Sequence, residues 1–513
     1  MALCALWAVA SLLLSLPLAL LIWKVLSLLV WEPLRMQKCL RDQGIGGPPY
    51  RIFVGNLREI IAMTKASRAS PLPHITHDIM PRVLPDFSTW SEQYGKPFLY
   101  WQGWKSRLAV VDPELCKELF TNKFGHYVKP AIPKQMNDLL VNGLVLLEGE
   151  KWAQHRKIVN PAFFLDKLKG MVPIIVTLTN GMLEKWKRES ENPACKEIDA
   201  FKEFHGLAAD FITHTAFGSS YAEGKQVFLL QYEQQALLLK LSFSALIPGI
   251  RFLPTAVNRY RWKLRKQIEA TLLKIVKKRL SLPSDDYGSD LLGLMLSARK
   301  EEDPTMTLQD IIDECKTFFF AGHETTTSLI TWTVMLLANH PEWQESARKE
   351  VLSLFGTSCP NADLLNHLKI IGMILQESLR LYPPVTGTLR ETTRDGKLGN
   401  IFIPKGTGFF VGVLPLHVDR ELWGDDALEF NPLRFANGVL KACKHPSAFV
   451  PFGSGPRVCV GQNFAMMEAK ITLCMILQKF RFRLSPGYRH APTVILTMQP
   501  EHGLQILLEP LVA

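Results

Sequence analysis

The residue best suited to bind a metal is Cys459, which lies between a glycine-rich turn and the start of a helical pattern. It belongs to the segment Phe452-Gly-Ser-Gly-Pro-Arg-Val-Cys-Val-Gly461. Glycines let the backbone bend sharply and let a large planar ligand approach it closely. The amides and dipole at the start of the next helix favour negative charge, so we expect Cys459 to be a thiolate, the form that binds metal. The alternative is a buried free cysteine in an ordinary loop.

A second candidate site lies at the centre of a long apolar run, residues 307–340. The central stretch reads Phe318-Phe-Phe-Ala-Gly-His-Glu-Thr-Thr-Thr327. An acid, several hydroxyls and a glycine inside an apolar helix conflict with the rules of helix stability, and such conflicts often mark function. A threonine hydroxyl that bonds back to a carbonyl could open a local kink there. The alternative is a polar stripe that faces a pocket of water.

Two helices are expected to position these groups. Thr307 and Asp310 form a capping-box-like start to the long run, whose roughly thirty residues would span about 45 Å. Its apolar residues on all sides predict burial through the centre of the molecule. In a second helix, Trp152 and Arg156 are four residues apart and share a face; alone, they would be an aromatic–cation pair on a surface helix.

The remaining sequence predicts a mainly helical chain with short strands. Residues 165–279 are interpreted as largely helical, with breaks at Pro173, Gly218 and residues 248–254. Residues 228–252 are interpreted as the lining of a substrate cavity, with ordinary core packing as the alternative. Strands are predicted at 98–101 and 108–111, within 388–404, at 408–413, and in a terminal hairpin that joins 494–498 to 504–508.

Composition limits the classes of function. With 513 residues, 47% of them hydrophobic, the chain has material for one large core. A net charge of +11 indicates an acidic partner or an anionic membrane surface, but no nucleic-acid-binding motif accompanies the basic stretches, so nucleic-acid binding is not expected. Nine cysteines, an odd number without C-x-x-C spacing, argue against a disulfide framework and for a reducing compartment.

The N-terminus predicts a membrane anchor. Residues 2–23 carry no charge and are long enough to cross a bilayer as a helix; a cleavable signal peptide is the alternative. Basic residues just beyond the apolar run predict that this side faces the cytoplasm. The predicted organisation is an anchor at 1–31, a basic and Pro/Gly-containing linker at 32–50, and a catalytic domain at 51–513.

Four motifs resemble those of the cytochromes P450 and follow that family's order. The haem-binding loop of the family is matched at every fixed position by Phe452, Gly455, Arg457, Cys459 and Gly461. The oxygen-activation motif is matched by Ala321, Gly322, Glu324, Thr325 and Thr326. The family's Trp-x-x-x-Arg pair resembles Trp152 with Arg156, and its ion-pair triad resembles Glu377, Arg380 and Arg434.

The resemblance implies a role for each of these residues. Cys459 would be the proximal ligand of the iron of haem b (iron protoporphyrin IX), where a thiolate favours O–O cleavage. Phe452 would pack beside the sulfur, and the haem propionates would be bound by Trp152, Arg156, Arg390 and Arg457. Thr325 would donate a hydrogen bond to the oxygen being activated, while Glu324, with waters, would relay protons to it. Because Cys459 would hold the iron, His323 is interpreted as structural.

The resemblance also implies a fold and a function. The fold would be the mainly helical P450 fold with a small β region, preceded by a transmembrane helix. The function would be that of a haem-thiolate monooxygenase of the endoplasmic reticulum membrane, with its catalytic domain in the cytosol. It would hydroxylate a hydrophobic small molecule with dioxygen and with electrons from NADPH, delivered by NADPH–cytochrome P450 reductase.

Further segments resemble a plant clan of the family. That clan oxidises cytokinins, brassinosteroids, gibberellins, triterpenoids and fatty acids, so lipid or hormone metabolism is implied. Two alternatives remain open. One is an isomerase or dehydratase of hydroperoxides with the same fold, which needs neither a reductase nor the Glu/Thr pair. The other is a membrane haem- or lipid-binding protein without turnover.

Overall fold

The computed structural model describes most of the chain, namely residues 16–121, 125–131, 142–190, 197–218, 226–234, 237, 250–281, 287–300 and 306–511. These residues belong to two compact units. The first unit comprises residues 1–69, 80–130 and 387–412, and the second comprises residues 70–79, 131–386 and 413–513.

The first unit begins with a continuous helical run, Leu16–Arg41, of 26 residues. Its middle turns are π-helical at Ser27–Trp31 (η1), and it continues as the α-helix α2 (Glu32–Arg41). The run is long and apolar enough to cross a membrane, and very little of its most apolar stretch is buried. Residues 1–15 of the predicted anchor lie outside the described part of the chain.

The first unit also contains a five-stranded sheet with the order β1-β2-β8-β5-β3. The predicted strands around the turn at Gly103 form an antiparallel hairpin, and β8 pairs with β2 in parallel. The buried rings of Phe87 and Trp90 pack against the ring of Phe98, which belongs to the sheet. The strands are β1 (Phe98–Gln102), β2 (Lys105–Val110), β3 (Tyr127–Val128), β5 (Gly387–Thr392), β8 (Gly408–Gly412) and a separate hairpin of β6 (Gly396–Leu398) and β7 (Ile401–Ile403). The helices are α3 (Leu57–Ser67), α4 (Met80–Val83), α5 (Pro85–Tyr94) and α6 (Pro113–Thr121).

The second unit is mainly helical, so the predicted mainly-α class with a small β region is confirmed. Its longer helices are α8 (Gly149–Val159), α9 (Leu165–Ser190), α10 (Ala200–Phe217), α12 (Ala256–Leu280), α13 (Leu291–Lys300), α14 (Leu308–Asn339), α15 (Pro341–Phe355), α16 (Lys369–Leu381) and α19 (Gln462–Lys479). Short helices are α17 (Val413–His417) and α18 (Arg420–Trp423), and the strands are β4 (Glu197–Asp199), β9 (Phe480–Leu484), β10 (Pro492–Val494), β11 (Met498–Pro500) and β12 (Gln505–Pro510).

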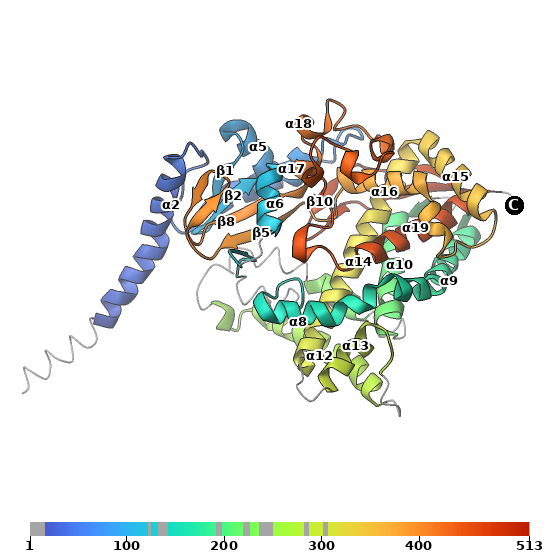
Figure 1. The fold of residues 1–513 in the computed structure, drawn as a ribbon, viewed down its shortest axis with the longest axis horizontal. Helices are drawn as coiled ribbons and strands as arrows, with labels where there is room; N and C mark the ends of the chain where they lie inside the picture. Colours follow the sequence, from blue (N-terminus) through green and yellow to red (C-terminus); the bar gives the residue numbers. More distant parts are fainter. Residues whose placement is uncertain are drawn as a thin grey trace, which may run out of the picture. The chain divides into compact units, whose positions relative to one another are not determined.

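The long central helix α14 positions the polar stretch at its middle. The Thr307 hydroxyl accepts a hydrogen bond from the Asp310 amide, while the Asp310 carboxylate accepts one from the Thr307 amide, so the predicted capping box is present. Almost every residue from Ile311 to Leu337 is buried or half-buried, because α10, α16 and α19 pack around it (Figure 1). The prediction of a buried helix is confirmed.

Two predictions for the second unit are wrong. Pro173 does not break the helix, since α9 runs through it for 26 residues. The buried side of α9, which includes Val172, Ile175 and Trp186, packs against α10 and α19, and this packing outweighs the roughly 3 kcal/mol that an interior proline costs. Gly218, by contrast, ends α10 in the left-handed conformation, as predicted.

The predicted terminal hairpin is also wrong. β10 pairs with β11 across residues 495–497, whereas β12 lies between β4 and β9 in a different sheet. Strand β9 directly follows α19, and β12 pairs with it. This pairing joins distant parts of the chain, so no local sequence pattern reveals it. Much of the predicted cavity lining, including residues 235–236 and 238–249, lies outside the described residues.

Candidate functional site

The segment at 452–461 turns back on itself and presents Cys459 at the start of α19. Gly453 and Gly455 adopt φ values of 72° and 69°, which favour glycine, and the Cys459 amide donates a hydrogen bond to the Phe452 carbonyl over 2.9 Å. A Cβ added to Gly461 would lie 4.0 Å from the Cys459 sulfur, which is van der Waals contact. The backbone at Gly461 therefore passes close to the sulfur. The cysteine is thus held at the N-terminal end of an 18-residue helix, as predicted.

The residue Cys459 is exposed, which argues against the alternative of a cysteine sealed in the core. Protein atoms nevertheless surround the sulfur closely enough that desolvation raises the pKa of the thiol, against the opposing effects of the Gly461 amide and the Arg156 guanidinium. The expectation that Cys459 is a thiolate therefore stays a prediction. A bound metal ion would favour the thiolate, because metal coordination deprotonates a thiol outright.

Trp152 on α8 and Arg457 in the cysteine loop lie against each other. The Arg457 guanidinium carbon lies 4.5 Å from the centre of the Trp152 ring, a cation–π contact. Arg457 Nη2 also donates to the Leu147 carbonyl over 2.8 Å and lies 2.6 Å from Glu148 Oε2. Desolvation lowers the pKa of Arg457, but Glu148 offsets part of this effect.

Arg156, one turn along α8 from Trp152, reaches the same loop. Its Nη1 donates to the Val458 carbonyl over 2.8 Å, and its pKa is lowered by desolvation and by neighbouring Arg457 while Cys459 raises it. Two guanidinium groups and an indole are thus gathered beside the exposed sulfur. This set of donors fits a group with a metal ion at its centre and carboxylates at its edge.

Arg390 belongs to the first unit, where it lies on β5. Its side chain is buried, its guanidinium carbon lies 5.5 Å from the centre of the Phe120 ring, and Nη1 donates to the Leu389 carbonyl. These contacts explain how the side chain is held in its own unit. Its predicted role in binding a propionate stays a prediction.

The polar stretch of α14 keeps its helical form. Thr325 Oγ1 donates to the Ala321 carbonyl over 2.6 Å, which is the predicted back-bonding, yet the helix continues without interruption. Gly322 has a packing reason: a Cβ there would lie 2.8 Å from Ile212 Cδ1 of α10. Glycine therefore lets α10 approach α14 closely at this level.

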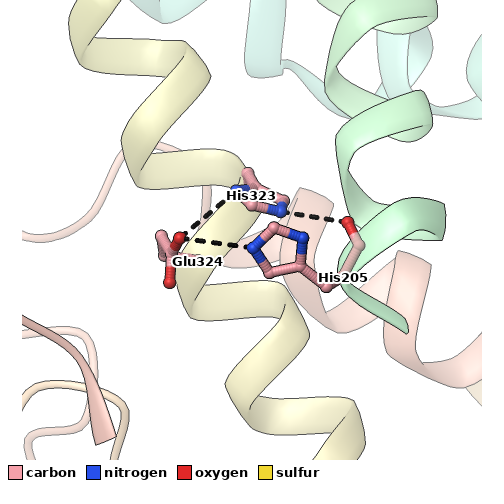
Figure 2. Close-up of side chains that lie close together, drawn as sticks. All are labelled: His205, His323 and Glu324. Atoms are coloured by element: carbon pink, nitrogen blue, oxygen red, sulfur yellow. Dashed lines mark hydrogen bonds and ion pairs between the residues drawn. The ribbon is translucent and has the colours of Figure 1, made fainter. Parts of the chain in front are cut away.

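Glu324 is buried among three polar side chains from different parts of the chain. Its Oε1 lies 3.5 Å from His323 Nδ1 and 3.7 Å from Nε2 of His205, which α10 contributes (Figure 2). Thr497 Oγ1 lies 3.5 Å from Glu324 Oε2. Desolvation lowers the pKa of His323 to about 4, so the ring is neutral at pH 7. Sequence reasoning missed His205 and Thr497, although a histidine in the largely apolar α10 is the same kind of signal that singled out Glu324.

Direct contacts fasten α14 to α19, the helix that follows Cys459. Thr326 Oγ1 donates to Glu468 Oε2 over 3.0 Å, and both side chains are buried. Burial raises the pKa of Glu468 well above its ordinary value of 4.5, and the hydrogen bond from Thr326 opposes part of this effect. Phe163 lies between the two helices, with ring centres 5.7 Å from Phe318 and 6.3 Å from Phe464. These contacts hold α14, which carries the polar motif, against α19, which follows the cysteine loop.

A buried pair in turn fastens α8 to α14. His155 Nδ1 lies 2.6 Å from Glu314 Oε1, and the other oxygen of Glu314 accepts a hydrogen bond from the Leu144 amide over 3.0 Å. At the start of α14, Lys151 Nζ lies 2.6 Å from Asp310 Oδ1. Sequence reasoning missed this link, because Glu314 and His155 are 159 residues apart and neither belongs to a recognised motif.

The predicted ion-pair triad is present and buried. Arg380 Nε and Nη2 each donate to a different oxygen of Glu377 over 2.7 Å, and Arg434 Nε lies 3.4 Å from Glu377 Oε1. The remaining donors of Arg380 reach backbone carbonyls of residues 417, 427 and 429. Asp426 is the residue that sequence reasoning missed: it lies 2.6 Å from Arg434, whose hydrogen bond lowers the pKa of the Asp426 carboxyl.

Comparison with known proteins agrees with this arrangement. The family model described as Cytochrome P450 matches residues 77–508. Cytochrome P450 709B1 from Arabidopsis thaliana is 45% identical over 512 residues, covering 98% of each chain. Cytochrome P450 734A1 from the same plant is 44% identical over 504 residues, covering 96% of each chain. Cytochrome P450 CYP72A616 from Paris polyphylla is 44% identical over 488 residues, covering 94% of each chain.

Proposed function

Because this chain belongs to the cytochrome P450 family, whose members are haem-dependent monooxygenases, we propose that it hydroxylates a hydrophobic small molecule, either a fatty acid or an isoprenoid or hormone-like compound. The observation that carries the proposal is the exposed Cys459 sulfur at the start of α19, beside Arg156 and Arg457. An inert cysteine would be buried away from charge, whereas Cys459 has the Arg156 guanidinium as a charged neighbour.

The proposed cofactor is haem b, with Cys459 as the ligand of its iron. Arg156, Arg457 and Trp152 would hold the propionates, Arg390 would assist them, and Phe452 would pack beside the sulfur. In the protein alone Arg457 pairs with Glu148, so a propionate would take over or share this cation. A propionate carboxylate in a partly buried site needs such a charged donor, since an unpaired charge is strongly disfavoured there.

Haem iron with a thiolate ligand supplies the activation of dioxygen. We assign the delivery of protons to α14. Thr325 would donate a hydrogen bond from its hydroxyl toward dioxygen, which requires the hydroxyl to leave the Ala321 carbonyl. Glu324 would pass protons inward through water. Its carboxylate is buried, but the neighbouring His205 is partly exposed, so protons from solvent could enter on that side.

The proposed electron source is NADPH, through NADPH–cytochrome P450 reductase. One oxygen atom would enter the substrate as a hydroxyl and the other would leave as water, with NADPH supplying the two electrons. The apolar helix of Leu16–Arg41 supports a single-pass anchor in the endoplasmic reticulum membrane, with the catalytic domain (51–513) in the cytosol and residues 32–50 as the linker.

The test is product formation in membranes that contain this chain and the reductase. Labelled fatty acids and labelled isoprenoids are supplied separately, with and without NADPH, under ¹⁸O₂. NADPH-dependent hydroxylated product that carries one ¹⁸O atom is the expected result, and the substrate set that reacts identifies the class. Fatty-acid hydroperoxides are supplied in a further assay without NADPH; their conversion would instead identify an isomerase or dehydratase. Binding without any product would identify a carrier protein. Membranes with Cys459→Ser serve as the matched control and should give no product.

A further inference from the structure

We propose that His205, His323 and Glu324 form a binding site for a divalent transition-metal cation, Zn²⁺ by preference, distinct from the cysteine loop. The three side chains come from two helices, α10 and α14, which pack against each other (Figure 2). One ligand atom from each residue lies within 4.8 Å of the other two. The site uses none of the residues proposed to hold haem.

The distances fit a metal ion. Glu324 Oε1 lies 3.5 Å from His323 Nδ1 and 3.7 Å from His205 Nε2. Tetrahedral Zn²⁺ with ligands at about 2.0–2.1 Å requires about 3.3–3.4 Å between neighbouring ligand atoms. The two distances to Glu324 therefore exceed this spacing by only a few tenths of an ångström, and all three ligand atoms lie within 4.8 Å of one another. One position of the tetrahedron remains for water.

A hydrogen bond fixes His323 in the form that a metal requires. Its Nε2 lies 3.0 Å from the His205 carbonyl, which can only accept, so Nε2 carries the proton. Nδ1 then presents a lone pair toward Glu324. Metal-binding histidines are oriented in this way, with the second ring nitrogen donating to a backbone carbonyl or a carboxylate. In this cluster, the residue whose carbonyl orients one ligand also supplies another ligand.

A cation between the side chains would satisfy the acceptor atoms that face each other in this cluster. The Nδ1 lone pair of His323 and the Oε1 atom of an ionised Glu324 both accept hydrogen bonds, and they face each other. A shared proton would draw such a pair to about 2.7–2.9 Å. The observed separations are wider and leave room for a larger cation.

The surroundings favour a transition metal over Mg²⁺ or Ca²⁺. Two imidazoles and one carboxylate suit Zn²⁺, whereas the lighter cations prefer oxygen ligands alone. Aromatic rings surround the two histidines. The ring centre of Phe228 lies 4.7 Å from that of His323, and the ring centres of Phe201 and Tyr232 lie 6.1 and 6.3 Å from that of His205. His205 remains 28% exposed, which gives an ion a route from solvent. If Glu324 relays protons as proposed above, a bound cation would block that relay and inhibit turnover.

The full chain is purified in detergent, treated with a chelator to remove bound metal, and titrated with Zn²⁺. Calorimetry measures the affinity and stoichiometry of binding. The variants are His205→Gln and His323→Gln, and the matched control is His367→Gln, which changes an exposed histidine elsewhere. Wild type and control are expected to bind one equivalent more tightly, by at least about tenfold, than either variant. The assay needs neither NADPH nor substrate, so its failure is distinct from a failure of the proposed monooxygenase activity.

Equal Zn²⁺ affinity and stoichiometry in all four proteins would overturn the proposal, since the ion would then bind elsewhere, for example at the exposed Cys359. X-ray absorption at the zinc edge of the loaded wild type keeps the test decisive if a variant fails to fold. Scattering by two imidazoles without sulfur is expected, whereas sulfur ligation would contradict the site.

Discussion

Two buried glutamates in neighbouring helices of the second unit have opposite environments. Glu377 on α16 has both oxygens bonded by Arg380 over 2.7 Å, and the Asn431 amide adds a third bond over 2.9 Å. His323, His205 and Thr497 are among the polar neighbours of Glu324 on α14 and lie 3.5–3.7 Å from it. A guanidinium thus holds the first carboxylate over short bonds, whereas these two imidazoles and the hydroxyl lie at longer distances from the second.

The difference shows which buried charge supports the fold and which is available for chemistry. A carboxylate with short bonds to a guanidinium stabilises its charged form and has no need to exchange protons. A carboxylate beside imidazoles and a hydroxyl can gain or lose a proton, or bind a cation, with small movements. We therefore expect substitutions at the first pair to reduce stability and substitutions at Glu324 to reduce activity.

The largest effect is expected for Arg380→Ala. This change leaves Glu377 as a buried charge with a single weak cationic neighbour, so the unfolding free energy should fall by about 3–5 kcal/mol. Denaturant unfolding of the purified protein measures it. Lys169→Ala, which removes an exposed ion pair with Asp363, is the control and should leave stability nearly unchanged. Similar small losses in both variants would contradict the assigned role of the pair.

The next effect concerns catalysis. Glu324→Gln keeps the shape of the side chain but removes its proton-transfer ability, so NADPH-dependent product formation should fall about 100-fold, while the unfolding free energy changes by no more than about 1 kcal/mol. Product analysis under saturating NADPH measures the first quantity and denaturant unfolding the second. A variant that unfolds readily, or one that retains full turnover, would remove the contrast with Glu377.

A third buried glutamate sharpens the comparison through pH. The folded-state pKa of Glu468 is raised well above 4.5 by burial, so its contribution to stability is complete below the unfolded-state pKa and is lost as pH rises toward the folded-state pKa. Glu468→Gln removes this dependence. Above pH 4.5 the variant should become more stable relative to wild type, by up to about 1.4 kcal/mol per pH unit. Parallel stability–pH curves for the two proteins would show that Glu468 is ionised.

The smallest effect is expected for Thr326→Val. This change removes the hydroxyl that donates to Glu468 Oε2 and leaves a buried acceptor without that donor, so stability should fall by about 1 kcal/mol. Thr326→Ser, which keeps the hydroxyl, is the matched control. Equal unfolding free energies for the valine and serine variants would mean that the bond does not help to fasten α14 to α19.

The sequence predicts much of the cysteine loop, the α8 pair and the α14 motif, because their residues are close in the chain and helical spacing brings them to one face. It also predicts Glu377 with Arg380, but not that Asp426 is a close partner of Arg434, since that contact depends on an irregular segment. His205 joins His323 from 118 residues away, and no local spacing reveals such a pair.

The wrong predictions have a common physical cause. Pro173 and the terminal hairpin were interpreted from local propensity, whereas tertiary packing and sheet edges decide both. For Cys459, the sequence shows the favourable start of the helix but not the desolvation by the surrounding protein, which raises the pKa of the thiol. Local sequence thus identifies the groups, while the environment of each group determines its charge.

The most direct test of the account is the carbon monoxide difference spectrum of the reduced, purified protein. If Cys459 binds haem iron as a thiolate, the wild-type spectrum shows the strongly red-shifted Soret band of thiolate ligation, and Cys459→Ser loses it. Absence of that band from the folded wild-type protein, or its persistence in Cys459→Ser, would contradict the assignment of Cys459 as the metal ligand.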